Sequence, residues 1–146
     1  MLIPIAIAGI FAAVFLFPRG RIGGPAAPLF YGALVMIWVG MAFRLWAILT
    51  LGRFFRTSVL MHDDHRLITS GPYHVLRHPS YTGSLVTLAG AGLAMGNWLS
   101  VLIAIMLPLP AFVRRIRVEE QALATRFGDA FEEQKRRTWA LFPFIW

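Results

Sequence analysis

Residues 83–113 have the sequence GSLVTLAGAGLAMGNWLSVLIAIMLPLPAFV, in which no side chain is Asp, Glu, Lys or Arg. A Gly-Asn-Trp sequence at 96–98 interrupts this apolar run near its middle. An apolar run of this length with a central turn signal predicts a helical hairpin, two helices of roughly 14–16 residues joined by a tight turn. This hairpin is the element around which we expect the rest of the chain to be organised.

Small residues and prolines give the hairpin its expected detail. Gly90, Gly92 and Gly96 offer small surfaces for close helix packing, and the last two form a GxxxG pair. Pro108 and Pro110 are expected to kink the second helix. A glycine-rich phosphate loop is not indicated, because no strand–turn–helix context surrounds these glycines.

The composition indicates lipid as the solvent for much of the chain. Of the 146 residues, 58% are hydrophobic and 14% charged, and the mean hydropathy is +0.65. Soluble domains carry roughly 25% charged residues, so in water this chain would expose large apolar patches. The absence of cysteine excludes a disulfide framework, a thiolate nucleophile and an iron–sulfur cluster.

Two further apolar segments precede the hairpin. Residues 2–17 predict a retained membrane helix, and residues 29–51 predict a second span that Arg44 interrupts. Arg44 is expected either to extend to the near membrane surface or to face a polar cavity. We therefore predict a single all-α, polytopic membrane domain over 1–146 with about four transmembrane helices. Its expected parts are two N-terminal spans (1–51), a cytosolic motif segment (52–82), the hairpin (83–113), and a cytosolic C-terminal helix and tail (114–146).

Basic residues predict the orientation in the membrane. Segments 52–82 and 114–146 together hold eleven Lys and Arg residues, whereas the loop 18–28 holds two. Because cytosolic loops are enriched in Lys and Arg, both large segments and both termini are expected in the cytosol. The net charge of +7 therefore indicates anionic lipid rather than nucleic acid as the partner.

A hairpin returns its end beside its start, so residues 77–81 and 114–120 are expected to meet in space. Between them they contribute Arg, His, Ser, Tyr and Glu side chains at one predicted mouth. Arg115 and Glu119, at i,i+4 spacing, share a helical face. They form either part of a functional site or an ordinary helical salt bridge, which is worth little on a surface.

Two other kinds of site find weaker support. His62, His65, His74 and His78 include i,i+3 and i,i+4 pairs, but Gly71-Pro72 separates the pairs and neither has the HExxH pattern. We therefore expect no metal site. A serine triad is not indicated either, since Ser80 lacks the flanking glycines of a nucleophile elbow.

The polar motifs resemble one membrane enzyme family. The sequence has HRLITSGPY at 65–73, RHPSYTG at 77–83 and EEQAL at 119–123, followed by Phe127-Gly128 and a closing LFPFI at 141–145. An RHPxYxG block followed after a hairpin by EExxL is typical of the isoprenylcysteine carboxyl methyltransferase family. The resemblance covers about residues 44–146, while the N-terminal part carries no family signature.

The resemblance implies an integral-membrane methyltransferase that uses S-adenosylmethionine, releases S-adenosylhomocysteine and has no Rossmann domain. Its cofactor pocket would lie on the cytosolic side. The residues that the resemblance assigns to the cofactor are His65, Arg66, Leu67, Ile68, Tyr73, His78, Pro79, Ser80, Tyr81 and Glu119. Arg115, one turn before the glutamate, would bind the acceptor, and Arg115 and Glu119 would form the catalytic pair.

The expected acceptor is lipophilic, with the carboxylate of a prenylated cysteine first among the choices. A related membrane sterol reductase that uses NADPH stays open, since Arg114, Arg115 and Arg117 could bind a 2′-phosphate. A membrane scaffold subunit without enzymatic activity stays open as well. The expected location is the cytoplasmic membrane of a bacterium or the endoplasmic reticulum of a eukaryote.

Overall fold

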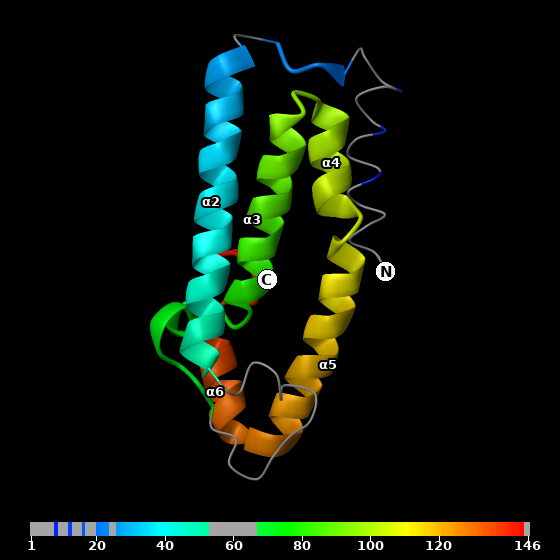
Figure 1. Ribbon diagram of the computed structural model, residues 1–146. Coiled ribbons are helices and arrows are strands. Elements are labelled where there is room, and N and C mark those ends of the chain that lie inside the picture. Colours follow the sequence, from blue (N-terminus) through cyan, green and yellow to red (C-terminus); the bar gives the residue numbers. More distant parts are fainter. Residues whose placement is uncertain are drawn as a thin grey trace. The chain divides into compact units, whose positions relative to one another are not determined.

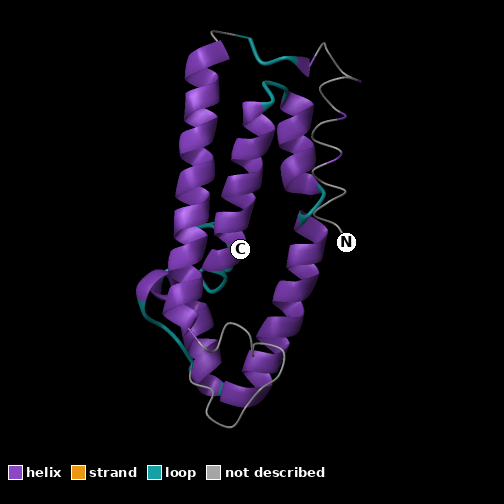
Figure 2. Ribbon diagram, viewed as in Figure 1, coloured by secondary structure: helices purple, strands orange, loops and turns teal. Residues whose placement is uncertain are grey.

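The computed structural model describes residues 8, 12, 16, 20–23, 26–52 and 67–144. Within these residues the chain is helical, with isolated β-bridges and no strand, so the all-α prediction is confirmed (Figure 2). The elements are α2 (Ala26–Leu51), the 3₁₀ helix η3 (Gly71–His74), α3 (Pro79–Ala94), α4 (Trp98–Met106), α5 (Leu109–Phe127) and α6 (Asp129–Arg137).

The chain packs as two compact units. One, here called the hairpin unit, comprises Met1–Ala42 and Gly83–Phe112. The other, here called the motif unit, comprises Phe43–Thr82 and Val113–Trp146. Helices α2, α3 and α5 each contribute residues to both units.

The hairpin unit contains the predicted hairpin. Helices α3 and α4 lie side by side in Figure 1, joined by the turn at residues 95–97. Asn97 is 1% exposed, and its side chain caps α4 by accepting a hydrogen bond from the Leu99 N–H at 2.9 Å. The loop before α2 joins this turn, since the Ile22 N–H donates to the Gly96 carbonyl at 2.8 Å.

Glycines let the helices of this unit approach closely, as predicted for two of them. A Cβ on Gly92 would lie 2.7 Å from Val101 Cα of α4, and one on Gly90 would lie 2.9 Å from Ile37 of α2. Gly40 of α2, which the sequence reasoning did not single out, meets Thr87 of α3 in the same way. The packing role expected for Gly96 is wrong. It has φ +62° with open space around its Cα, so it is needed for the turn.

The hairpin helices differ from the prediction at both ends. Helix α3 begins at Pro79 rather than near residue 83, because proline suits the first turn of a helix. The kink expected in the second arm is confirmed as a break, since α4 ends at Met106 and α5 starts at Leu109. Helix α5 then continues to Phe127, well past residue 113, and so carries the EEQAL motif on the helix that leaves the hairpin.

Two described segments, Ala26–Leu51 and Trp98–Phe127, are long and apolar enough to cross a membrane. Helix α2 matches the span predicted over 29–51, and it exposes large apolar side chains such as Tyr31, Trp38 and Leu49. Exposed apolar surface of this extent is expected of a helix in contact with lipid. The first predicted span, 2–17, lies almost entirely outside the described residues.

The motif unit is built on the C-terminal half of α5. Gly128, with φ +50°, ends α5, and the chain reverses into α6. Ile116 and Phe131 form its core, with 0% and 1% of their surface exposed. After α6, residues 138–141 run beside residues 75–78 through a parallel bridge between Leu76 and Trp139.

Candidate functional site

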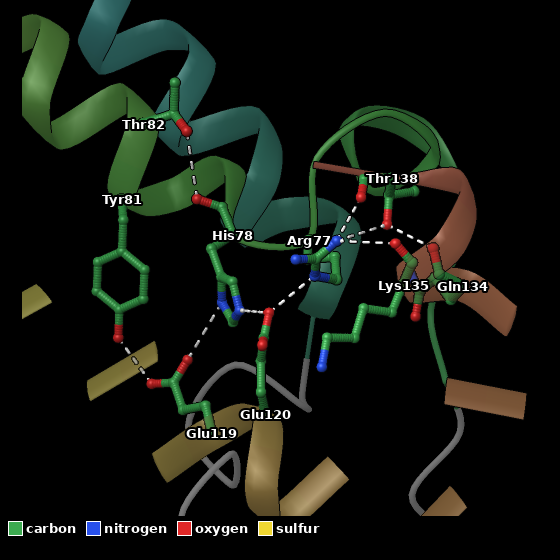
Figure 3. Close-up of polar contacts among 9 residues, drawn as sticks. All are labelled: Arg77, His78, Tyr81, Thr82, Glu119, Glu120, Gln134, Lys135 and Thr138. Atoms are coloured by element: carbon green, nitrogen blue, oxygen red, sulfur yellow. Dashed lines mark hydrogen bonds and ion pairs between the residues drawn. The ribbon is translucent and has the colours of Figure 1, made fainter. Parts of the chain in front are cut away.

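The candidate site lies in the motif unit, where the first turn of α3 faces α5 (Figure 3). His78 is 6% exposed, and its backbone N–H donates to the Ala140 carbonyl at 3.0 Å. The Tyr81 N–H donates to the His78 carbonyl at 3.1 Å, which closes the first turn of the helix. Backbone pairing on one side and helix formation on the other therefore hold the RHPSY motif in place.

Glu119 is the acceptor at the centre of this site. Its Oε1 accepts a hydrogen bond from the Tyr81 hydroxyl at 2.7 Å and another from Arg115 Nε at 3.0 Å. Its Oε2 lies 3.6 Å from His78 Nδ1. The carboxylate is 15% exposed. Residues 77–81 and 114–120 thus meet as the hairpin geometry predicted.

Glu120, the next residue, faces the other partner of the motif. Its Oε1 accepts from Arg77 Nε at 2.7 Å and lies 3.3 Å from His78 Nε2. The Arg77 and Glu120 side chains are 7% and 13% exposed. Ions removed from water in this way need close partners, because leaving one charge unpaired is strongly destabilising.

The two glutamates decide the protonation of His78. Burial by itself lowers the pKa of the imidazole, but hydrogen bonds to Glu119 and Glu120 outweigh it, and the pKa lies above its ordinary value of 6.5. The protonated ring can donate from both nitrogens, one toward each carboxylate. Burial and the negative charge of Glu119 also raise the pKa of the Tyr73 hydroxyl to about 12, which keeps it a neutral donor.

Arg115 is 60% exposed, whereas the side chains of His78 and Glu119 are 6% and 15% exposed. The i,i+4 salt bridge with Glu119 forms as the spacing indicated. However, the Glu119 carboxylate is nearly buried, accepts a hydrogen bond from Tyr81 and lies close to His78. The Arg115–Glu119 pair is therefore part of a network and not an isolated surface pair. Arg115 therefore has a guanidinium accessible from outside and a fixed internal partner.

The remaining residues predicted for the cofactor have varied surroundings. Tyr73 is buried on η3, and Pro79 is fully buried at the start of α3. The Ser80 carbonyl accepts from Arg44 Nη1 at 3.1 Å, and the Ile68 carbonyl accepts from Gln134 Nε2 at 3.4 Å. Leu67 is half-buried in the segment before η3. His65 and Arg66 lie outside the described residues.

Sequence reasoning missed several residues of this network. Arg44, a membrane-helix residue of undecided role, is tied to the backbone of α3. Arg77 and Glu120 were quoted within motifs without a role, although two adjacent charged or polar pairs, RH and EE, were a visible signal. Thr82 donates to the Leu141 carbonyl at 2.6 Å, a contact that no local pattern indicates.

Metal ligation was tested on the same residues. Within 20–23, 26–52 and 67–144, no group of three or more His, Asp or Glu side chains is placed to hold a metal ion. His62 and His65, with the two aspartates between them, lie outside the described residues. The acidic side chains of the described site are instead engaged by Arg, His and Tyr.

Fold and site together define a class: a helical membrane protein in which a buried cluster of Arg, His, Tyr and Glu joins the start of one hairpin helix to the helix that leaves the hairpin. The sequence model of the isoprenylcysteine carboxyl methyltransferase (ICMT) family matches residues 33–125, which is more than half of the chain. The chain belongs to the isoprenylcysteine carboxyl methyltransferase family.

Individual relatives agree with this assignment. A rice protein (Oryza sativa subsp. indica) named probable protein-S-isoprenylcysteine O-methyltransferase is 36% identical over 117 residues, 79% of this chain and 61% of its own length. The protein-S-isoprenylcysteine O-methyltransferase of Schizosaccharomyces pombe is 32% identical over 115 residues, 77% of this chain and 49% of its own. This chain thus spans about half to three fifths of the length of these relatives.

A solved structure has the same fold. It is described as the eukaryotic intramembrane Ras methyltransferase ICMT (isoprenylcysteine carboxyl methyltransferase) without a monobody. The match has a TM-score of 0.79 and 27% sequence identity, and it covers 99% of this chain and 51% of the other. The predicted resemblance is therefore confirmed at the level of family and fold.

Proposed function

We propose that this chain is an integral-membrane methyltransferase that moves a methyl group from S-adenosylmethionine to the carboxylate of a prenylated cysteine or a similar lipid-like acceptor. The observation that carries the proposal is the meeting of RHPSY with Glu119 and Glu120 in one buried cluster, in a chain of this family. The names of the relatives support the same activity.

The residues present suit S-adenosylmethionine. A carboxylate has about four acceptor positions, and Glu119 has donors from Tyr81, Arg115 and His78 near it. It keeps capacity for one more donor, such as a ribose hydroxyl or the amino group of the cofactor. Tyr73, His78 and Tyr81 add aromatic surface that would shield the cofactor from water. Leu67, Ile68, Pro79 and Ser80, with His65 and Arg66, complete the proposed set.

Arg115 is the residue that we propose binds the methyl acceptor. Its guanidinium can hold a carboxylate through paired hydrogen bonds and direct one oxygen toward the methyl group. The exposure of Arg115 supports this role, since an acceptor must reach it from outside. Its bond to Glu119 positions it next to the proposed cofactor residues.

Methyl transfer to a carboxylate does not require general acid or base catalysis. When bound, S-adenosylmethionine supplies an electrophilic methyl group on a sulfonium. The S–CH₃ bond breaks as the O–CH₃ bond forms, giving a methyl ester and the thioether S-adenosylhomocysteine. A carboxyl with an ordinary pKa of about 4 is already ionised at neutral pH, so no proton needs to move. The protein contributes orientation and exclusion of water.

We propose an orientation with both termini and the site on the cytosolic side. The eleven basic residues of segments 52–82 and 114–146 support it through the positive-inside rule. A water-soluble cofactor would then enter from the cytosol and a lipid-soluble acceptor from the bilayer. The membrane would be the cytoplasmic membrane in a bacterium and the endoplasmic reticulum in a eukaryote.

Calorimetric titration of detergent-purified protein tests the activity class. S-adenosylmethionine and S-adenosylhomocysteine are expected to bind, and Glu119→Ala is expected to weaken both by at least tenfold. Methyl transfer to a farnesyl-cysteine analogue is then expected. Binding of NADPH alone would favour the reductase, and binding of none of the three by folded protein would favour the scaffold subunit.

A further inference from the structure

Arg77 makes polar contacts with three residues of the motif unit (Figure 3). Its Nε donates to Glu120, while its Nη1 donates to the carbonyls of Lys135 and Thr138 and lies 3.4 Å from Thr138 Oγ1. Those carbonyls stand at the end of α6, where the last turn of a helix leaves carbonyls without intrahelical donors. Arg77 thus caps α6 while it neutralises a buried carboxylate.

The segment that follows α6, Thr138–Leu141, is also held by backbone bonds. The Arg77 and His78 N–H groups donate to the carbonyls of Trp139 and Ala140 at 2.8 and 3.0 Å, and the Trp139 N–H donates to the Val75 carbonyl at 3.1 Å. Ala140 and Leu141 are buried. The C-terminal segment therefore forms one wall against which the RHPSY motif is fixed.

Glu120 links this wall to the candidate site. Its Oε1 accepts a hydrogen bond from Arg77 Nε at 2.7 Å and lies 3.3 Å from His78 Nε2. The Nδ1 atom of the same imidazole ring lies close to Glu119. A continuous path of polar contacts runs from the C-terminal segment through Arg77, Glu120 and His78 to Glu119. Because protein groups occupy Arg77 and Glu120, these two act through their neighbours and not by touching a ligand.

We propose that Arg77 and Glu120 are positioning residues whose ion pair ties the C-terminal segment Thr138–Leu141 to His78 and Glu119, so that this distant segment sets the geometry of the cofactor site. This inference rests on the proposed function for its ligand, while the coupling within the protein stands on the contacts above. The motif pairs RH and EE would then divide the work, with one member of each pair at the ligand and the other behind it.

The test uses the full chain in detergent. Arg77→Lys keeps the charge but loses the fork that reaches Glu120 and the α6 carbonyls together. Glu120→Gln keeps an acceptor, whereas Glu120→Leu removes it. The matched control is Arg117→Lys, which changes an exposed arginine of α5, the helix that carries Glu120. Each variant is measured for S-adenosylhomocysteine binding, for KM and kcat, and for hydrogen exchange of the backbone amides within 77–82 (all except Pro79, which has none) and at 139.

We expect Arg77→Lys and Glu120→Leu to raise the Kd for S-adenosylhomocysteine and the KM for S-adenosylmethionine at least tenfold, with the acceptor KM changed less than threefold. The same variants should speed exchange at residues 77–82 and 139 at least tenfold, while exchange in α4 is unchanged. Glu120→Gln should restore part of the affinity. The double variant Arg77→Lys/Glu120→Leu should be no worse than either single one, since both break one path.

Faster exchange at residue 139 with unaltered exchange at 77–82 and an unaltered Kd would overturn the proposal, because the segment would then be a structural support only. Wild-type protein that does not bind S-adenosylhomocysteine would contradict the proposed function instead. In that case the exchange at 77–82 still decides the positioning role, since it needs no ligand.

Discussion

The Tyr81 hydroxyl donates a 2.7 Å hydrogen bond to Glu119 Oε1, although the two residues are 38 positions apart in the chain. The hairpin between them brings the start of α3 beside α5, so a contact remote in sequence becomes the centre of the site. Glu119 also receives Arg115 through the same oxygen. The hydrogen bonds that this carboxylate accepts are the basis for predicting how substitution of each neighbouring residue changes ligand binding.

Removing the tyrosine hydroxyl should weaken the cofactor site without unfolding it. Tyr81→Phe keeps the ring but takes one donor from Glu119, a loss worth about 1.5–3 kcal/mol for a bond to a charged group. If the whole loss appears in binding, we expect roughly a 10–150-fold rise in the Kd for S-adenosylhomocysteine by calorimetry. Tyr31→Phe, an exposed residue of α2, is the control, and equal affinities in the two variants would argue against a ligand role for this cluster.

Substitution of Arg115 should impair use of the methyl acceptor while leaving cofactor binding nearly unchanged. Arg115→Ala is expected to lower methyl transfer to a farnesyl-cysteine analogue by about a hundredfold or more, since a charge-assisted pair of hydrogen bonds to the acceptor is lost. The Kd for S-adenosylhomocysteine should change less than about threefold, because Arg115 is 60% exposed and a solvent-exposed ion pair to Glu119 is worth little compared with the part-buried hydrogen bond from Tyr81. The comparison is with Arg117→Ala. Turnover that survives Arg115→Ala would point to an amine or thiol acceptor.

Stability should fall as pH rises through the range in which His78 loses its proton. The folded pKa of His78 lies above its ordinary value of 6.5, so the protonated ring stabilises the fold fully below that value. The contribution is lost as pH rises through the folded pKa. Thermal unfolding in detergent should show a midpoint that declines as the pH rises above 6.5 and through the raised pKa of His78. His78→Gln should flatten this part of the profile, and His74→Gln, at an exposed position, should leave it unchanged.

The hairpin should tolerate alanine at some glycines and not at others. A Cβ on Gly92 would lie 2.7 Å from Val101 Cα, so Gly92→Ala is expected to destabilise the fold by about 1–3 kcal/mol through overpacking. Gly32→Ala, in open space on α2, should instead stabilise the helix by about 0.5–1 kcal/mol. Equilibrium unfolding in mixed detergent gives both values. A neutral Gly92→Ala would contradict close contact between α3 and α4.

The sequence by itself determined the features that depend on composition and local pattern. The apolar runs predicted helix α2 and the two helices of the hairpin, and the break near Pro108 followed from the backbone chemistry of proline. The two motifs identified the family. The hairpin geometry predicted that residues 77–81 lie close to Glu119 and Glu120. These inferences succeed because periodicity, turn residues and motif spacing are local features that can be identified from the sequence alone.

Only the tertiary structure decided which partner each charged residue takes. Arg44 binds the Ser80 carbonyl, Arg77 caps α6, and Thr82 reaches Leu141 across 59 positions. It also showed that Gly96 forms the turn and does not pack, and that Gly40 packs against Thr87. Such contacts depend on the register and rotation of helices about one another, and the hydrophobic pattern of a single helix leaves both undetermined. The C-terminal part was predicted as a helix and tail, and only the structure showed that its backbone pairs with residues 75–78.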